Sequence, residues 1–375
     1  MKYLSDIHFP ELYEAHRIRS PEFVAQMLKE LNMPRGRPKG SSNKKSTQAE
    51  ALQTALDFVS YAENDILECS KFVKLNNNMA VVFSSQISAG HPIDEELNLI
   101  PNLAMLRAGI ARCGKSLVIT ETNTNGLSIK GDKLRAVVPC SIEVMPEVQP
   151  DPPVIEGDFN ILKEAFKVCG TLASEAGEKV YLASLLLNPN TCTGTNGSAI
   201  MQYWHGINMP AGTVISKLFA AAVVKQSKDI TGIGANYNSE LGFCTSFTVW
   251  FKGGAWLKTQ CYQDRWPDIA TVLDKQIELV KTPEGLFEGI DATLAFADSK
   301  AVYFAEGYIN SHDNPALGAQ YQVEGLTSGK TFDGKLLKQV APWADKVDLT
   351  TYPDRLFFAG GEASNPVRGC VAGYA

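Results

Sequence analysis

Five cations and no acidic residue lie in a short stretch near the N-terminus that is rich in Gly, Pro and Ser. The stretch reads MPRGRPKGSSNKK over residues 33–45, and its cations are Arg35, Arg37, Lys39, Lys44 and Lys45. A segment of this composition cannot bury a core, so its charges remain available to phosphate groups. Two interpretations follow: a solvated basic linker, or a segment that binds polyanions.

The seven residues PRGRPKG (34–40) resemble an AT-hook. In that motif a Gly-Arg-Pro backbone lies extended in the narrow minor groove of A·T-rich DNA, where the negative potential attracts arginine. The resemblance implies that Arg35 and Arg37 enter the groove. Lys39, Lys44 and Lys45 would then contact the flanking phosphates.

The rest of the sequence contains no motif that assembles catalytic chemistry. TCTGTNG (191–197) has a Cys but no His-Asn context for a nucleophile, and GIGANYNSELG (232–242) lacks the glycine spacing of a dinucleotide-binding turn. Phosphate-binding loops, the zinc motif H-E-x-x-H and carboxylate clusters with metal-ligand spacing are also missing. We therefore expect no enzymatic activity, no catalytic residue, no metal and no cofactor.

Composition describes a globular chain with an uneven charge distribution. The chain has 375 residues, of which 45% are hydrophobic and 20% charged, and this length predicts two or three domains. Its net charge is −6, so the chain outside residues 33–48 carries about −11. Eight scattered cysteines without a C-x-x-C pair predict buried free thiols. Charges near the N-terminus and the lack of a long apolar run predict a cytoplasmic protein without membrane contact.

From residue 49 onward a helix–strands–helix–strands pattern occurs three times. The first helices of the three sets are expected over 49–62, 158–173 and 283–298, and the second helices over 102–114, 211–226 and 333–344. Asn125-Gly126 predicts a β-hairpin in the first set. The pattern predicts an α+β fold with helices on one side of antiparallel sheets. The expected division is an N-terminal extension (1–48) with a short helix over 20–33 and the basic arm, followed by domains at 49–150, 151–279 and 280–375.

Three phrases, in this order along the chain, resemble the bacterial-type DNA polymerase sliding clamp. They are LSIKGDKLRAVVPC (127–140), YQDRWPDIATVL (262–273) and LLKQVAPWADKVDLTTYPDRLFFAG (336–360), and the resemblance covers residues 49–375. The family's Thr-Asp-Gly-His-Arg stretch appears only as QYWHGIN (202–208), and the chain ends in VAGYA where the family has Met-Pro-Met-Arg. These departures suggest a bacteriophage-type clamp, located in the host cytoplasm.

The resemblance implies a ring of clamp-type domains around duplex DNA, formed by a head-to-tail dimer. A sheet edge of the first domain in one copy would meet a sheet edge of the third domain in the other. Helices would face the hole, because cations that contact only phosphates permit sliding. The candidate cations on these helices are Arg107, Arg112, Lys115, Lys163, Lys167, Lys217, Lys225, Lys228, Lys335 and Lys338. For each of them the alternative is an ordinary solvated helix face.

The resemblance also implies partners. A DNA polymerase and a clamp loader would each insert a short peptide into a hydrophobic pocket between the second and third domains. The residues carried over by position are Trp204, His205, Ile207, Pro267, Val272, Val371 and Ala372. The alternative for the apolar members is a place in an ordinary core.

Two other functions are compatible with the sequence. One is a DNA-binding regulatory protein that acts only through the basic arm. The other is a phage structural protein with repeated α+β domains.

Overall fold

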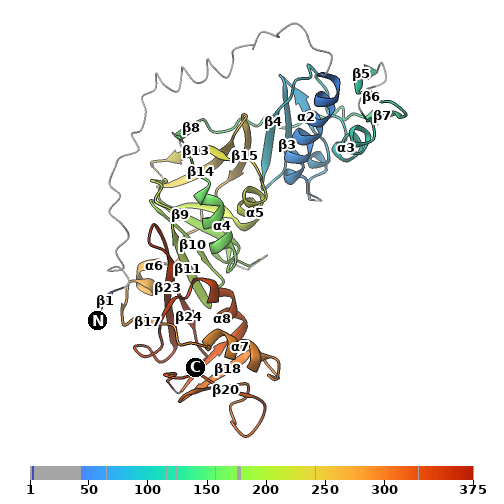
Figure 1. The fold of residues 1–375 in the computed structure, drawn as a ribbon. Helices are drawn as coiled ribbons and strands as arrows, with labels where there is room; N and C mark the ends of the chain where they lie inside the picture. Colours follow the sequence, from blue (N-terminus) through green and yellow to red (C-terminus); the bar gives the residue numbers. More distant parts are fainter. Residues whose placement is uncertain are drawn as a thin grey trace. The chain divides into compact units, whose positions relative to one another are not determined.

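The chain folds into two compact units. The computed structural model describes residues 2–3, 44–64, 66–114, 116–122, 125–156, 158–174, 179–240, 242–327 and 329–374. Unit 1 consists of Ile161–Ala221 and Tyr262–Ala375 together with the N-terminal strand (Figure 1). Unit 2 consists of residues 44–160 and Ala222–Cys261. Each unit therefore combines two segments that are distant in sequence, and the division into three domains remains a prediction.

Unit 2 is built on a seven-stranded antiparallel sheet. Its strands, in spatial order, are β2 (Lys74–Asn76), β3 (Met79–Phe83), β4 (Ser88–Pro92), β15 (Ala255–Gln260), β14 (Phe243–Phe251), β13 (Ile230–Asn238) and β8 (Pro153–Glu156). Strand β4 pairs with β15, which joins two distant parts of the sequence. Gly90 is required at this junction, because a Cβ there would lie 2.2 Å from the Trp256 indole.

Two helices and a small sheet complete unit 2. They are α2 (Lys44–Val59), α3 (Leu103–Ala111) and the three-stranded sheet β5 (Val118–Thr122), β6 (Gly126–Lys130) and β7 (Arg135–Pro139). Helix α2 buries Leu52 and Leu56 and packs against β3, β4 and α3. The predicted hairpin is confirmed, with Asn125 at a φ of 53° between β5 and β6. The predicted start of the first helix at residue 49 is wrong, because α2 begins at Lys44 and so includes the end of the basic stretch.

A buried carboxylate fixes the start of β8 to the sheet of unit 2. Asp151 accepts hydrogen bonds of 2.9 Å from the Ser246 and Thr248 hydroxyls and forms an ion pair of 2.9 Å with Lys258. The exposed fractions of the Lys258 and Asp151 side chains are 14% and 9%. Lys258 also donates to the carbonyl of Gln149 at 2.9 Å. We call these contacts the Asp151 network; they hold the segment that precedes β8 against β14 and β15.

Unit 1 is built on an eight-stranded antiparallel sheet. Its strands, in spatial order, are β12 (Thr213–Ser216), β9 (Ser184–Asn188), β10 (Thr191–Thr195), β11 (Ala199–Trp204), β24 (Asn365–Ala372), β23 (Arg355–Glu362), β22 (Lys346–Asp348) and β17 (Val280–Lys281). The ladder between β11 and β24 joins its two halves. Helix α4 (Ile161–Gly170) packs against β9, β10 and β11 (Figure 1).

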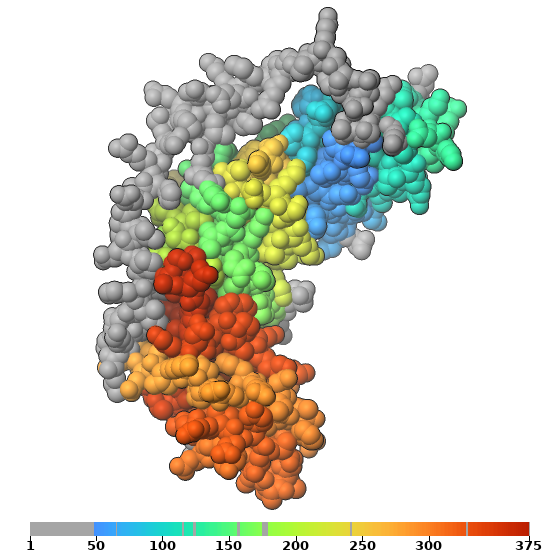
Figure 2. Space-filling model, in the orientation of Figure 1, coloured from blue at the N-terminus to red at the C-terminus, as the bar shows by residue number. Residues whose placement is uncertain are grey.

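A second sheet and two helices form the remainder of unit 1. The strands, in spatial order, are β20 (Gln320–Gln322), β19 (Tyr308–Asn310), β18 (Ala301–Ala305) and β21 (Lys330–Asp333). Helices α7 (Leu286–Leu294) and α8 (Gly334–Val340) pack against this sheet and each other, and both reach the surface (Figure 2). Asp333 caps α8 by accepting from the backbone N–H groups of Lys335 and Leu336.

The α+β prediction is confirmed, since every strand pair in the described residues is antiparallel. Helix α5 (Lys217–Val224) is shorter than the predicted 211–226, because Thr213–Ser216 is the fully buried strand β12. Its Thr-Val-Ile run is β-branched and favours a strand. All eight cysteines are described as free thiols, six of them buried, which confirms that prediction. Over the ranges described, no helix combines the length and apolar character needed to span a membrane.

Candidate functional site

A cavity of about 270 Å³ opens within unit 1 beside the short helix α6 (Ile269–Leu273). We call it the α6 pocket. It is formed by the end of β10 and start of β11, the segment leading into α6, the turn before β23, and the end of β24. Its lining residues are Tyr181, Thr195, Gly197, Ser198, Ala199, Ile200, Trp266, Pro267, Asp268, Ile269, Val272, Asp354, Arg355, Cys370 and Ala372.

Local sequence explains why α6 lies at this position. Asp268 caps the helix by accepting from the backbone N–H of Ala270 at 3.0 Å. Leu273 at the other end is fully buried in a cluster with Ile200, Ile277, Phe357 and Cys370. Two further α6 residues, Ile269 and Val272, pack partly against this cluster and partly line the pocket. The helix is therefore fixed by its cap and its buried end, and it presents two apolar side chains to the pocket.

The pocket combines an apolar floor with an aromatic wall and a charged rim. Tyr181 and Trp266 meet edge to face with ring centres 6.3 Å apart, and Trp266 Nε1 donates to Ser184 Oγ at 3.3 Å. Burial raises the pKa of the Cys370 thiol to about 12, so this lining residue is a neutral thiol at pH 7. A small apolar cavity with few polar groups suits the apolar or aromatic side chains of a bound peptide or small molecule.

A buried guanidinium joins three elements of the pocket. Arg368 on β24 is 8% exposed. Its Nε donates to Gln202 Oε1 on β11 at 2.8 Å, and its Nη1 donates to Asp274 Oδ1 at the end of α6 at 3.0 Å. Burial lowers the pKa of Arg368, and the Asp274 carboxylate offsets part of this effect. Arg368 thus ties β11, β24 and α6 together.

The structure separates the predicted pocket residues into two groups. Pro267, Val272 and Ala372 line the α6 pocket. Val371 is fully buried between the lining residues Cys370 and Ala372, so its side chain faces the opposite side of β24. The other three, Trp204, His205 and Ile207, lie at or beyond the far end of β11 from the pocket-lining Ala199 and Ile200.

Sequence reasoning missed the segment Thr195–Ile200 and the aromatic pair at the pocket wall. No residue of QYWHGIN (202–208) lines the pocket, whereas Thr195 and Gly197, with a Thr-x-Gly spacing, do. These residues form the turn between β10 and β11, where Gly197 has a φ of 90°. The turn signal Asn-Gly could have identified this turn.

His205 has a structural role at the far end of β11. Its exposed fraction is 5%, and its Nδ1 accepts from the backbone N–H of Ile207 at 3.1 Å. Burial lowers the pKa of His205 to about 4, and an interaction with the backbone of Thr191 offsets part of this shift. The folded chain therefore holds a neutral imidazole at this position.

We expect the free energy of unfolding to fall below neutral pH because of His205. The imidazole binds a proton near pH 6.5 in the unfolded chain but only near pH 4 in the folded chain. The contribution of neutral His205 to the free energy of unfolding is therefore fully present above pH 6.5 and is lost as the pH falls towards 4. The loss is about 2 kcal/mol at pH 5. Urea unfolding at pH 7 and pH 5 measures it. His205→Gln should remove most of this difference and His312→Gln should retain it; an unchanged pH dependence in His205→Gln contradicts the assignment.

The predicted helix cations have different environments. Arg107 contacts the Asp57 carboxylate at 2.6 Å, and Lys338 is paired with Asp291. Lys167 lies 3.6 Å from Glu164. An anion would have to compete with these carboxylates. Helix α7 also carries acidic residues, so the predicted positive helix faces are not uniform.

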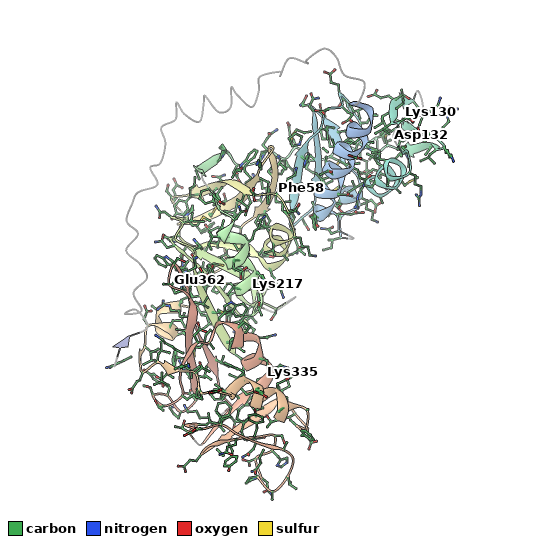
Figure 3. All side chains as sticks on the ribbon, viewed as in Figure 1. Phe58, Lys130, Asp132, Lys217, Lys335 and Glu362 are labelled. Atoms are coloured by element: carbon green, nitrogen blue, oxygen red, sulfur yellow. The ribbon has the colours of Figure 1, made fainter. Side chains whose placement is uncertain are left out.

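Other candidates are exposed or contact neutral groups. Lys225 and Lys335 are exposed, and Lys163 is half-buried. Arg112 Nη1 donates to the Ala108 carbonyl at 3.3 Å, and Lys217 Nζ donates to the Ala173 carbonyl at 2.7 Å. Lys217 and Lys335 project from the helix-bearing side of unit 1 in Figure 3, away from Glu362 on the β23–β24 hairpin.

One further predicted cation contacts a histidine, and several others lie outside the described residues. In unit 2, Lys228 contacts His91 and lies 5.8 Å from the centre of the Phe58 ring, and burial lowers the pKa of Lys228. The other predicted features lie outside the described residues: Arg35, Arg37, Lys39, Lys115 and the helix at 20–33. Lys44 and Lys45 are described only as the first residues of α2.

Across the described residues, no group of three or more His, Cys, Asp or Glu side chains is arranged to hold a metal ion.

No protein-family model and no curated protein sequence matches the chain. Solved structures do match it in fold. The DNA polymerase III subunit beta of Pseudomonas aeruginosa is 14% identical with a TM-score of 0.69, over 87% of this chain and 98% of that one. The Helicobacter pylori beta clamp bound to a DNA ligase peptide is 13% identical with a TM-score of 0.66, over 88% and 98%. A putative DNA polymerase III beta subunit from Eubacterium rectale is 11% identical with a TM-score of 0.68, over 87% and 98%. The chain thus has the sliding-clamp fold.

Proposed function

We propose that this chain is a DNA polymerase processivity factor. Two or more copies form a ring around duplex DNA, and the ring tethers a replicative polymerase during DNA replication. The observation that carries the proposal is the sliding-clamp fold, which extends over 87% of this chain and 98% of the Pseudomonas aeruginosa protein. We further propose a bacteriophage origin, with action in the cytoplasm of the host.

The α6 pocket is the proposed site for partner peptides. Its apolar floor and aromatic wall support this role, as does the likeness to a beta clamp that was solved with a DNA ligase peptide. A DNA polymerase and a clamp loader are the proposed partners. Each would present a short segment whose apolar side chains fill the pocket.

Ring closure is proposed to use the outer strands of two sheets. β7 is an edge of the small sheet in unit 2, and β20 is an edge of the four-stranded sheet in unit 1. The opposite edge, β21, is bridged to Gly373. Phe296 just beyond α7 and Met105 on α3 are 67% and 49% exposed, although both are large and apolar. Pairing of β7 with β20 of a second copy would extend both sheets and cover these side chains.

The proposed DNA contacts are the helix cations together with the N-terminal arm. Lys163, Lys167, Lys217, Lys225, Lys335 and Lys338, with Arg107, Arg112 and Lys115, would contact phosphates without reading sequence. The arm would add an AT-hook-like grip on A·T-rich DNA, through Arg35 and Arg37 in the minor groove. This grip is accessory, because encirclement does not depend on it.

We expect Arg35→Ala/Arg37→Ala to weaken low-salt binding to a short linear A·T-rich duplex. Each lost phosphate or groove contact removes about 0.9 from the slope of log K against log salt, so the slope should fall by about 2. Fluorescence anisotropy between 50 and 200 mM salt measures it. Lys252→Ala/Lys281→Ala removes two exposed cations elsewhere and should leave the slope unchanged. An unchanged slope in the arm variant would show that the arm is a solvated linker.

Retention on circular DNA tests the proposed function. Protein assembled by a clamp loader should remain on nicked circular DNA at 0.5 M salt and should leave after the circle is linearised, because only a linear molecule has ends. Gel filtration with light scattering should give a dimer. A monomer, or equal loss from circular and linear DNA, would overturn the proposal.

The same experiment tests the proposed interface through a matched pair of variants. Phe296→Glu should convert the dimer to monomers and release circular DNA, because it places a charge in an apolar contact. Ile66→Glu changes a residue that is 71% exposed and lies outside the proposed interface, and it should behave like the unchanged protein. A dimer that survives Phe296→Glu would exclude this contact as the site of ring closure.

A further inference from the structure

The N-terminus of the chain forms a strand next to the α6 pocket. β1 (Lys2–Tyr3) pairs antiparallel with β16 (Gln276–Ile277), which follows α6 after two residues. Ile277 is 1% exposed and belongs to the same buried cluster as Ile200 and Cys370. Since Ile200 and Cys370 also line the pocket, the β16 edge and the pocket floor share one core.

The register fixes the direction in which the chain leaves this ladder. Lys2 lies opposite Ile277 and Tyr3 opposite Gln276, so each step forward from the N-terminus moves back along the partner segment towards Asp274 and α6. Helix α6 presents Ile269 and Val272 to the pocket. From Lys2 to Tyr3, β1 therefore runs in the direction of α6 and its pocket.

The sequence that follows the ladder has suitable chemistry. Residues 4–9 read LSDIHF, with apolar side chains at Leu4, Ile7 and Phe9 between polar ones. Six extended residues span up to about 20 Å, whereas the five residues of α6 span only about 8 Å, so the reach is sufficient. Apolar and aromatic side chains at this spacing match the apolar floor and the aromatic wall of the pocket.

We propose that the β16 edge and the α6 pocket form one continuous docking surface for an extended peptide, and that residues 2–9 of the chain itself occupy it. This inference rests on the proposed role of the pocket as a peptide site. The occupant adds a strand to β16 and places its next apolar side chains against Ile269 and Val272. The N-terminus thus competes with partner peptides, and a partner binds only by displacing it.

The loss of apparent affinity that a tethered segment causes for a competing peptide can be estimated. A segment on a short tether acts at an effective concentration of about 1 mM. If the free peptide binds with a Kd of about 0.1 mM, the tethered copy weakens the apparent affinity of any competitor by about tenfold. Substitutions that prevent the tethered segment from binding should therefore raise the apparent affinity of a competitor about tenfold.

The experiment uses full-length protein and a fluorescein-labelled synthetic peptide with the sequence of residues 1–12 as the probe. Ile7→Asp/Phe9→Asp should bind the probe about tenfold more tightly than the unchanged chain does. Val24→Asp/Leu28→Asp makes the same chemical change elsewhere in the N-terminal extension and should bind like the unchanged chain. Fluorescence anisotropy gives the three affinities.

A fourth protein separates the failure of this inference from the failure of the proposed function. Val272→Asp, combined with Ile7→Asp/Phe9→Asp, should lose the probe because the pocket is altered. Equal binding by the unchanged chain and Ile7→Asp/Phe9→Asp, with loss in the combined variant, would overturn self-occupation but leave the pocket as a peptide site. Binding that the combined variant retains, or binding by none of the proteins, would overturn this inference and count against the pocket as well.

Discussion

Val272→Asp is expected to weaken peptide binding to the α6 pocket at least 100-fold, or about 3 kcal/mol. Val272 lies between the pocket and the buried cluster of unit 1, so a peptide seated there would bury the new carboxylate without a partner. The DNA ligase peptide that binds the Helicobacter pylori beta clamp is a suitable probe, measured by calorimetry.

Thr271→Asp provides the matched control, because it introduces the same charge one residue earlier on the same helix. Thr271 is exposed, is absent from the pocket lining and donates its hydroxyl to the Asp268 carbonyl. We expect it to bind peptide within about threefold of the unchanged protein. Thermal unfolding of both variants checks that α6 remains folded. Equal affinities for Val272→Asp and the unchanged protein would exclude this pocket as the peptide site.

Lys258→Met is expected to lower the free energy of unfolding of unit 2 by about 3–5 kcal/mol. The substitution keeps the length of the side chain but removes the cation 2.9 Å from Asp151, whose side chain is only 9% exposed. The carboxylate then remains buried with hydroxyl partners alone, and an uncompensated buried charge is far more costly than a lost surface pair. Urea unfolding followed by tryptophan fluorescence measures the change.

Two further variants test this explanation. Asp151→Asn/Lys258→Met removes both charges and should recover much of the lost stability, because no unpaired ion remains. Lys338→Met breaks the pair with Asp291, whose side chains are 46% and 63% exposed, and should cost less than about 1 kcal/mol. If Lys258→Met and Lys338→Met had similar effects, burial of the Asp151 network would not be the cause.

Local patterns predicted most elements but not their exact ends. The apolar spacing at Leu52 and Leu56 identified α2, and Asn125-Gly126 identified a hairpin. The start of α2 at Lys44 was missed because the basic composition favoured a linker. Strand β12 was merged with α5, because a short buried β-branched run has no period that distinguishes it from a helix.

Contacts between distant segments could not be predicted from the sequence. Arg368 donates hydrogen bonds to Gln202 and Asp274, which are 166 and 94 residues away in the sequence. The residues next to Arg368 in the sequence do not predict either partner. Pro267 and Val272, where a continuous phrase carries the resemblance, line the α6 pocket. Trp204, His205 and Ile207 do not line it, and the diverged five-residue stretch behind that prediction offers few residues to align.

The ladder between β11 and β24 has a consequence for synthesis on the ribosome. Strand β11 must wait for Asn365–Ala372, about 160 residues after its own last residue, and β4 in unit 2 waits about as long for Ala255–Gln260. At about 5–20 residues per second, that wait lasts roughly 10–30 s. During this time the edge of β11 is an open template for pairing with other chains. Both nascent units therefore expose an unpaired strand edge until the second segment of their sheet has been made.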